Sequence, residues 1–281
     1  MNHKKEMLMQ AVFLLTACIS ILSVLLICIF LFMNGLPAIQ EIGWGNFLFG
    51  IVWRPANNLF GIFPMIIGSL YVTAGALVTG VPIGILTAVF MAHFCPERWY
   101  RPLKAAINLM AGIPSVVYGF FGLVVLVPFV RDNIGGFGMG VLTASVLLGL
   151  MILPTIISVS EAAIRAVPSS YYEGGLALGA SHERSIFFAV LPAAKRGILA
   201  AVILGIGRAI GETMAVIMVA GNQAMLPTSL TSGVRTLTTN IVMEMGYSSG
   251  LHREALIGTA VVLFVFVLLI NSSFSLLHKE E

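Results

Sequence analysis

Charged side chains are scarce in this sequence. Asp, Glu, Lys and Arg make up 10% of its 281 residues, while hydrophobic residues make up 58% and the mean hydropathy is +1.00. Soluble domains carry about 25% charged residues, so the composition excludes a soluble globular protein. The few basic residues lie in short loops and form no patch, so the net charge of +3 does not indicate a nucleic-acid partner.

Cysteine is also rare. Cys18, Cys28 and Cys95 are too few and too scattered for a disulfide framework or a zinc site, so we expect no metal. Leu15-Thr-Ala-Cys18 is similar to a lipoprotein cleavage box, but the apolar run continues to Met33, far beyond a signal-peptide core. We therefore interpret this segment as an uncleaved first span.

A nucleotide-binding loop is missing. A Walker A loop needs Gly-Lys followed by Ser or Thr, and the five lysines follow His, Lys, Leu, Ala and His. We therefore predict that this chain is not an enzyme and holds no cofactor, and that a partner subunit binds any ATP and Mg²⁺.

Long apolar runs dominate what is present. A transmembrane helix needs about 20 mostly apolar residues. Six runs reach that length: Ala11–Met33, Phe63–His93, Lys104–Val130, Met139–Ser160, Gly197–Gly221 and Ala255–Leu277. The fold class is therefore all-α, a polytopic membrane protein with six transmembrane helices.

Positive charges set the expected orientation. With a cytoplasmic N-terminus, ten of the 15 Lys and Arg residues fall in inner segments and four in outer ones. Cytoplasmic loops are enriched in Lys and Arg, so we predict that both termini are cytoplasmic. The organisation that follows is a first helix with an external segment (1–62), a five-helix core (63–277) and a cytoplasmic tail (278–281). The core includes a cytoplasmic loop (161–196) and an external segment (222–254).

Two charges interrupt the fifth run. Arg208 and Glu212 are the only charged residues inside any of these apolar runs except at their ends, and Arg208 falls near mid-depth. Four residues apart on one helix, they share a face and can pair. Gly205, Gly207 and Gly211 remove side-chain bulk nearby, which allows a close approach by other backbone or by a ligand.

The buried pair has two interpretations. It is either a structural ion pair that holds the helix to its neighbours, or an anion contact on a transport path, with Glu212 holding Arg208 between passages. We favour the second, because ionisable groups inside membranes usually mark function. The planar guanidinium also matches tetrahedral oxyanions in a bidentate way.

Proline and glycine interrupt other spans, notably at Gly80-Val-Pro82 and Gly112-Ile-Pro114. Such breaks are tolerated where neighbouring helices satisfy the freed backbone groups. We expect a simple kink at Pro82.

The inner segment Glu161–Arg196 predicts two short helices. Pro168-Ser-Ser170 starts the first and Gly179 ends it; Ser181 caps a second, His182–Leu191, which Pro192 closes. The alternative is an amphipathic hairpin that lies on the membrane. The ordered capping instead favours a protruding element that another subunit binds.

The same segment resembles the EAA loop of type I ABC importer permeases, whose pattern is Glu-Ala-Ala, three residues, Gly, nine residues, Ile-x-Leu-Pro. Here Glu173-Gly-Gly175, Gly179 and Ala189-Val-Leu-Pro192 keep the spacing, with glycine at both alanine positions and alanine at the isoleucine position.

Further motifs resemble the PstC-type permeases of phosphate-specific ABC importers. They are Gly112-Ile-Pro-Ser-Val-Val-Tyr-Gly119, Gly207-Arg-Ala-Ile-Gly-Glu-Thr-Met214 and Ala220-Gly-Asn222. The likeness runs from the second span to the last and implies the type I ABC permease fold, in a bacterial or archaeal cytoplasmic (inner) membrane.

The resemblance also implies partners: a PstA-like second permease, a PstB-like ATPase dimer inside and a PstS-like phosphate-binding protein outside. The residues it assigns to the substrate path are Arg208, Glu212 and Thr213. Those assigned to ATPase coupling are Tyr172, Glu173, Gly174, Gly175, Ala177, Gly179 and Ala180. Pro114, Gly205, Gly207, Gly211 and Asn222 are expected to serve helix packing or gating.

Other functions stay open at this point. Within the transport class, a permease for molybdate, sulfate or phosphonate is the nearest alternative. A secondary transporter would also place charges at mid-depth, although the two halves show no convincing repeat. A phosphate-sensing scaffold is the third alternative, and it would have no need of Arg208.

Overall fold

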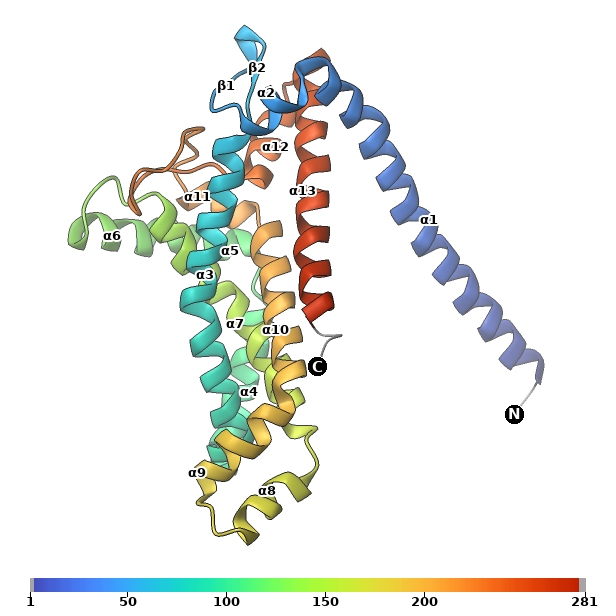
Figure 1. Cartoon of the computed structure of the whole chain (residues 1–281), viewed down its shortest axis with the longest axis vertical. Helices are drawn as coiled ribbons and strands as arrows, with labels where there is room; N and C mark the ends of the chain where they lie inside the picture. The colour runs from blue at the N-terminus through green and yellow to red at the C-terminus, as the bar shows by residue number, and fades with distance from the viewer. Residues whose placement is uncertain (1–2, 278–281) are drawn as a thin grey trace.

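The computed structural model describes residues 3–277, with the side chains of residues 6–272. It is an elongated helical bundle from which one long helix leans away (Figure 1). A β-hairpin at Trp53–Phe60 marks one end, which we call the hairpin end. The short helices within Ser169–Ser185 mark the other, which we call the α8 end. The predicted tail 278–281 lies outside the described residues.

The chain begins with the leaning helix and crosses the hairpin end. These elements are α1 (His3–Ile42), α2 (Trp44–Phe49), β1 (Trp53–Arg54), the 3-10 turn η1 (Pro55–Asn57) and β2 (Leu59–Phe60). The two strands are antiparallel, with Trp53 paired to Phe60.

The central part of the chain contains the two helices that pack most extensively against each other, α3 and α7. It comprises α3 (Phe63–Val89), the π-helical η2 (Phe90–Phe94), α4 (Glu97–Gly112), α5 (Ser115–Phe121), the π-helical η3 (Gly122–Leu126), α6 (Val127–Asn133) and α7 (Val141–Arg165).

The last part runs from the α8 end back to the hairpin end and then down the bundle. It comprises α8 (Ser169–Ala177), α9 (His182–Ser185), the π-helical η4 (Ile186–Val190), α10 (Leu191–Gly211), α11 (Met214–Val219), α12 (Leu237–Met245) and α13 (Gly250–Leu277).

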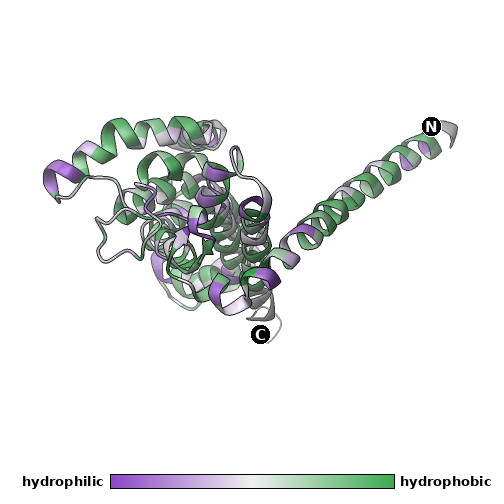
Figure 2. Cartoon of the chain, turned by 90° about the horizontal axis from the view of Figure 1, so that it is seen from above, coloured by the Kyte–Doolittle hydropathy of each residue, from purple (hydrophilic) through white to green (hydrophobic). Residues whose placement is uncertain are grey.

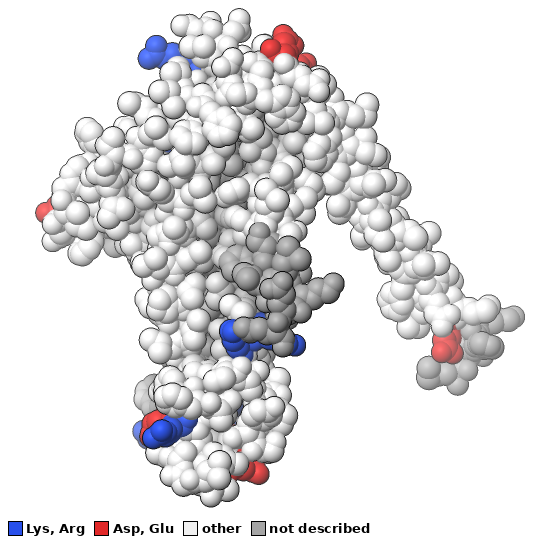
Figure 3. Space-filling model, viewed as in Figure 1, with Lys and Arg blue, Asp and Glu red and all other residues white. Residues whose placement is uncertain are grey.

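Six helical stretches of the described residues are long and apolar enough to cross a membrane, as predicted. They are Glu6–Ile42, Phe63–Phe94, Ser115–Asn133, Val141–Arg165, His182–Gly211 and Gly250–Ser272. On the face shown in Figure 3, charged side chains lie at the hairpin end, in the lower part of the bundle, at the tip of α6 and at the free end of α1, leaving a wide uncharged band across the upper half of the bundle.

Two predicted spans have different boundaries in the structure. The run Lys104–Val130 is not one helix: it breaks at Ile113 and Pro114, whose backbones are extended, and only the part after the break is span-like. The run Gly197–Gly221 also breaks, after Gly211, where Glu212 is extended. Hydropathy cannot detect either break, because the residues on both sides are apolar.

Two proline predictions have opposite outcomes. Pro82 lies inside the continuous α3, as expected. Pro192 was wrongly predicted to end a helix: it stands in the first turn of α10, and helical structure runs from His182 to Gly211 through the π-helical η4. The π-helical turn η4 directly before Pro192 changes the local hydrogen-bond pattern and lets the helix continue past the missing N–H.

Helix α7 is the centre of the bundle. It packs mainly against α3 and α10, and Leu147, Met151, Ile152 and Ile156 are buried on it. Glycines allow the close approach of α3: a Cβ added at Gly80 would lie 2.9 Å from the carbonyl oxygen of Gly149. Inside a membrane the hydrophobic effect does not drive helices together, so small residues that permit close van der Waals packing become important.

Helix α1 contacts the bundle only near its C-terminal end. Gly35 packs against Gly258 of α13, and Ala38 and Ile39 are fully buried, whereas the side chains of residues 6–27 are exposed and mostly apolar. Seen from above, this exposed helix is a hydrophobic arm extending from the bundle (Figure 2).

Gly80→Ala is expected to destabilise the protein by about 1–3 kcal/mol, because the added methyl meets backbone that cannot move without shifting α7. Thermal unfolding in detergent measures this effect. The control is Gly246→Ala, where nothing lies within 4 Å of an added Cβ and the backbone is helical. Equal unfolding temperatures for the two variants would contradict the packing argument.

Candidate functional site

Arg208 stands in the last turn of α10 and is partly exposed. Its only hydrogen bond to the described residues goes from Nη1 to Oγ1 of Thr155 on α7, at 3.4 Å. A Cβ added at Gly207 or Gly211 would have no atom within 4 Å. Open space therefore lies beside Gly207 and Gly211, and most donors of the guanidinium have no partner among the described residues.

Glu212 does not pair with Arg208. The described side chains form no ion pair between them; instead Oε1 of Glu212 accepts the backbone N–H groups of Thr213 and Ala215, each at 3.1 Å. The expected pairing assumed a continuous helix, but α10 ends at Gly211 and the extended backbone of Glu212 removes the i,i+4 geometry. The carboxylate caps the start of α11, whose first amides have no partner within the helix.

The other residues predicted for the substrate path, helix packing or gating make separate local contacts. Thr213 donates its hydroxyl to the carbonyl of Gly211 at 3.3 Å, at the end of α10. Gly205 faces Ile156 of α7, 3.1 Å from an added Cβ, which is a packing role. Asn222, with a φ of 52°, ends the α11 region by donating its amide to the carbonyl of Ile217 at 2.7 Å.

The helices that follow the breaks at Pro114 and Glu212 pack against each other. Pro114 precedes α5, and α5 packs against α11, so that a Cβ at Gly119 would lie 3.0 Å from the Cα of Ala215. Tyr118 donates its hydroxyl to the carbonyl of Met110 across the Pro114 break, at 3.0 Å. Two interrupted spans therefore meet next to Arg208.

At the α8 end, the predicted coupling residues separate into an inner and an outer set. Tyr172 and His182 share a 2.7 Å hydrogen bond between the phenol oxygen and Nδ1, and Tyr172 stacks on His93 of η2. Gly179, with a φ of 82°, turns the chain, and Ala180 donates its N–H to the carbonyl of Gly175. These contacts hold α8 against α9 and η2.

The two glycines of the EAA-like motif are not equivalent. A Cβ at Gly175 would lie 2.6 Å from Oγ of Ser185, whereas one at Gly174 would meet nothing within 4 Å. Glu173, Gly174, Ala177 and Leu178 are exposed, and Leu178 is 91% exposed. The outer surface of α8 is therefore free to contact another subunit.

A buried carboxylate ties the helices together just inside the α8 end. Glu161 of α7 is 2% exposed and contacts Lys104 at 2.7 Å, Arg165 at 2.9 Å and the hydroxyl of Tyr100 at 2.7 Å. Arg165 also donates to the carbonyl of Met91 in η2. The hydrogen bond to Glu161 raises the pKa of Tyr100, so the phenol keeps its proton. Sequence reasoning missed this cluster, although Glu161 and Arg165 are four residues apart.

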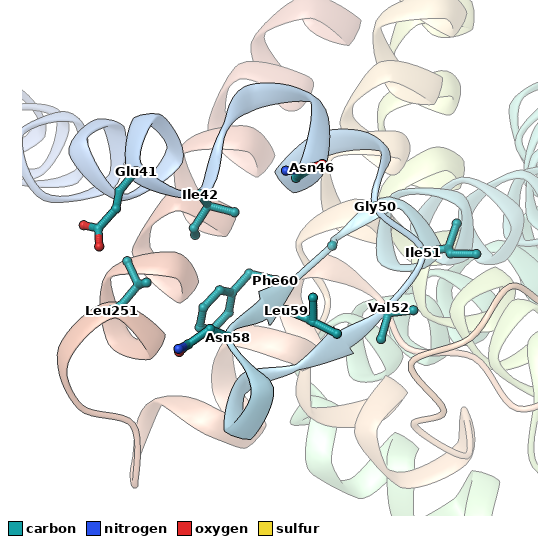
Figure 4. Close-up of a pocket in the computed structure, with 11 residues that line it drawn as sticks. Glu41, Ile42, Asn46, Gly50, Ile51, Val52, Asn58, Leu59, Phe60 and Leu251 are labelled. Carbon is teal, nitrogen blue, oxygen red and sulfur yellow. The ribbon is translucent and has the colours of Figure 1, made fainter.

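A second buried carboxylate lies at the hairpin end. Glu244 of α12 accepts from Trp53 of β1 at 2.9 Å and from Arg235 at 2.7 Å, and it contacts His252 of α13 at 2.8 Å. Figure 4 shows the neighbouring pocket, about 520 Å³ in volume, beneath the hairpin, with Glu41, Asn46 and Asn58 as its polar lining. These bonds join the hairpin, α12 and α13 into one unit.

Comparison with known proteins identifies a family. The sequence model described as "Binding-protein-dependent transport system inner membrane component" matches residues 80–279. A similar protein is the probable ABC transporter permease protein YqgH of Bacillus subtilis, 39% identical over 92% of this chain and 88% of that one. The phosphate transport system permease protein PstC of Mesorhizobium japonicum is 33% identical over 87% of this chain and 81% of that one.

Solved structures share the fold. A subunit of a bacterial ABC transporter that imports the acidic polysaccharide alginate superposes with a TM-score of 0.65 at 16% identity, over 99% of this chain and 98% of that one. A chain of the MetNI methionine ABC transporter superposes with a TM-score of 0.59 at 21% identity, over 80% of this chain and 97% of that one. The predicted type I ABC importer permease fold is therefore confirmed.

Glu161→Ala is expected to destabilise the protein by about 1–3 kcal/mol, because it leaves Lys104, Arg165 and the Tyr100 hydroxyl without their buried acceptor, while water reaches both cations. The measurement is thermal unfolding in detergent. Glu97→Ala, which removes an exposed carboxylate at the start of α4, serves as the control and should stay near the wild type. Similar losses in both variants would show that the cluster is not a clamp.

Proposed function

This chain belongs to the family of binding-protein-dependent transport system inner membrane components, and we propose that it is the permease subunit of an ATP-driven importer that moves inorganic phosphate across the cytoplasmic membrane. The fold and the family carry the general statement, a multi-pass permease subunit. Phosphate as the substrate is supported by relatives named as phosphate permeases that are 33% identical over most of the chain.

Arg208 is the proposed contact for the anion. Moving a phosphate with one or two charges through a low-dielectric region is prohibitive without a cation. The single long bond to Thr155 and the open space beside Gly207 and Gly211 leave the guanidinium free to receive a tetrahedral oxyanion with two parallel hydrogen bonds. One fixed cation lowers the barrier without trapping the ion.

Glu212 takes a different role from the one expected. Its Oε1 is used by α11, so it does not neutralise Arg208 in this conformation. Oε2 accepts no hydrogen bond from the described residues and is free to accept the P–OH of a protonated phosphate. Sulfate, which is fully ionised at neutral pH, has no proton to offer and would leave the carboxylate unpaired.

A second, PstA-like permease is the proposed occupant of the face beside Arg208 and of the α1 arm. The arm exposes about two dozen mostly apolar side chains along residues 6–27, and the open side of Arg208 is not closed by the described part of this chain. A path at the interface of two permeases would use both features. The orientation predicted from positive charges places a PstS-like protein at the hairpin end.

A PstB-like ATPase dimer is the proposed partner at the α8 end. The exposed face of α8 carries Glu173, Ala177 and Leu178, while Tyr172 and Gly175 pack against α9 and η2 and Gly179 makes the turn between α8 and α9. Such a contact would transmit nucleotide-driven movement to the break beside Arg208, because α9, η4 and α10 form one continuous helix from His182 to Gly211.

Arg208→Gln is expected to reduce phosphate uptake at least 100-fold in proteoliposomes that contain the complete importer, since the site loses its only cation. Arg208→Lys keeps the charge but loses the planar guanidinium, so its uptake rate should lie between those of the wild type and Arg208→Gln. The control, Arg253→Gln, removes an exposed Arg at the start of α13. Near-normal uptake by Arg208→Gln in an assembled complex would defeat the proposal.

Ala177→Cys, in a chain whose Cys18, Cys28 and Cys95 are replaced by Ser, is expected to crosslink to the ATPase and not to the external binding protein. The exposed position of Ala177 on α8 is the reason. Ala56→Cys at the exposed hairpin is the matched control and should show the reverse. Crosslinks from Ala177→Cys to the binding protein would contradict both the orientation and the coupling role.

A further inference from the structure

Thr155 is the only side chain of the described residues that accepts a hydrogen bond from Arg208. It precedes Ile156 on α7, where α7 crosses α10 so closely that a Cβ added at Gly205 would lie 3.1 Å from the Ile156 side chain. One turn further along α10, Nη1 of Arg208 donates to Oγ1 of Thr155 at 3.4 Å. The crossing at Gly205 therefore sets the register in which the hydroxyl and the guanidinium meet.

The hydroxyl of Thr155 is not used by its own helix. Threonine hydroxyls in helices commonly donate to the carbonyl one turn earlier. Thr79, Thr87 and Thr259 do so here, with the carbonyls of Gly75, Ile83 and Ala255 at 3.1, 2.7 and 2.9 Å. Thr155 makes no such bond within the described part of the chain, and its oxygen accepts from Arg208 instead. This hydroxyl therefore serves a contact between helices.

The contact uses one nitrogen of the guanidinium and leaves a complete edge free. Arginine has five N–H donors, and Nη1 is the only nitrogen of Arg208 with a partner among the described residues. Nε and Nη2 together form an edge that can bind two oxygens of one anion. A guanidinium anchored at Nη1 can present this edge without first giving up its side-chain freedom at each passage.

A neutral acceptor suits this task better than a carboxylate. A carboxylate at the same place would neutralise the cation and compete with the anion, whereas a hydroxyl oxygen leaves the positive charge intact. The neighbouring polar groups are engaged elsewhere. Glu212 accepts from the amides of Thr213 and Ala215, and Tyr118 donates to the carbonyl of Met110. Orientation of Arg208 within this chain therefore depends on Thr155.

We propose that Thr155 is a positioning residue for anion passage: its hydroxyl oxygen anchors Nη1 of Arg208 on α7, so that Nε and Nη2 are presented to a tetrahedral oxyanion. The proposal rests on the proposed phosphate transport by this chain. It concerns the passage of the anion past Arg208 and not ATP hydrolysis at the α8 end.

The test uses the complete importer in proteoliposomes, with uptake of labelled phosphate at saturating concentration and ATP hydrolysis measured in parallel. Thr155→Val replaces the hydroxyl by a methyl group of similar size. It is expected to lower the maximal uptake rate about tenfold, because Arg208 loses its anchor. ATP hydrolysis should stay at the wild-type rate, so that less phosphate moves per ATP. Thr155→Ser keeps the hydroxyl and should restore most of the uptake.

A double variant tests whether Thr155 acts through Arg208. The ammonium of Arg208→Lys is a point charge without a fixed edge, so its orientation matters little. Adding Thr155→Val to Arg208→Lys is therefore expected to lower uptake by less than about twofold further, a non-additive effect. A full additional loss would show that Thr155 acts independently of Arg208 and would overturn the positioning role.

The matched control is Thr87→Val on α3, whose hydroxyl bonds only to the carbonyl of Ile83 among the described residues; its uptake should equal that of the wild type. Wild-type uptake by Thr155→Val, or an equal fall of uptake and ATP hydrolysis, overturns the positioning role while phosphate transport stands. If the wild-type importer takes up no phosphate, the proposed function fails, and the positioning role with it.

Thr155→Ala serves if Thr155→Val does not assemble, because alanine fits wherever threonine did. The same loss of phosphate moved per ATP is expected from it, with the same rescue by Thr155→Ser. Equal uptake by Thr155→Ala and Thr155→Ser would show that the hydroxyl is not needed and would overturn the proposal.

Discussion

Every backbone N–H inside a membrane must find a partner within the protein, and this requirement governs the fifth span. When α10 ends at Gly211, the first amides of α11 lose their helical partners in a region without water. The carboxylate of Glu212 accepts two of them, from Thr213 and Ala215. The break is stable because the Glu212 carboxylate supplies the acceptor that these amides would otherwise lack.

That use of Glu212 leaves Arg208 without a neutralising partner among the described residues. The guanidinium keeps one long bond to Thr155 and faces open space created by Gly207 and Gly211. A continuous helix would have paired the two charges and closed the site. Because α10 ends at Gly211, the two charges have different partners: Glu212 caps α11, and Arg208 donates to Thr155 of α7.

A buried carboxylate fixes each end of the molecule. Glu161 binds α7 to α4 and η2 at one end, and Glu244 binds the hairpin to α12 and α13 at the other. Removing one partner from such a buried cluster is costly, which keeps each end rigid. Between them, α7 packs against α3 and α10, while the spans that contain Pro114 and Glu212 are interrupted. Movement applied at α8 is therefore expected to appear at the breaks next to Pro114 and Glu212 rather than at the ends.

Local patterns in the sequence were enough for the fold class. Six apolar runs predicted six spans, and Pro168, Gly179 and Ser181 predicted the start, the turn and the cap of the loop at the α8 end, because hydropathy and turn chemistry depend on neighbouring residues alone. The EAA-like spacing and the Arg208 motif also indicated the family, and Arg208 as a candidate, before any coordinates.

The partners of the charges could not be predicted in the same way. The sequence by itself determined that Arg208 lies in an apolar segment, since this follows from the composition around it. Only the tertiary structure decided that α10 stops at Gly211, that Glu212 accepts from the amides at the start of α11, and that Arg208 donates to Thr155 of α7. The physical reason is that each of these outcomes depends on which groups remain unsatisfied after distant helices have packed, and Thr155 and Arg208 are 53 positions apart along the chain.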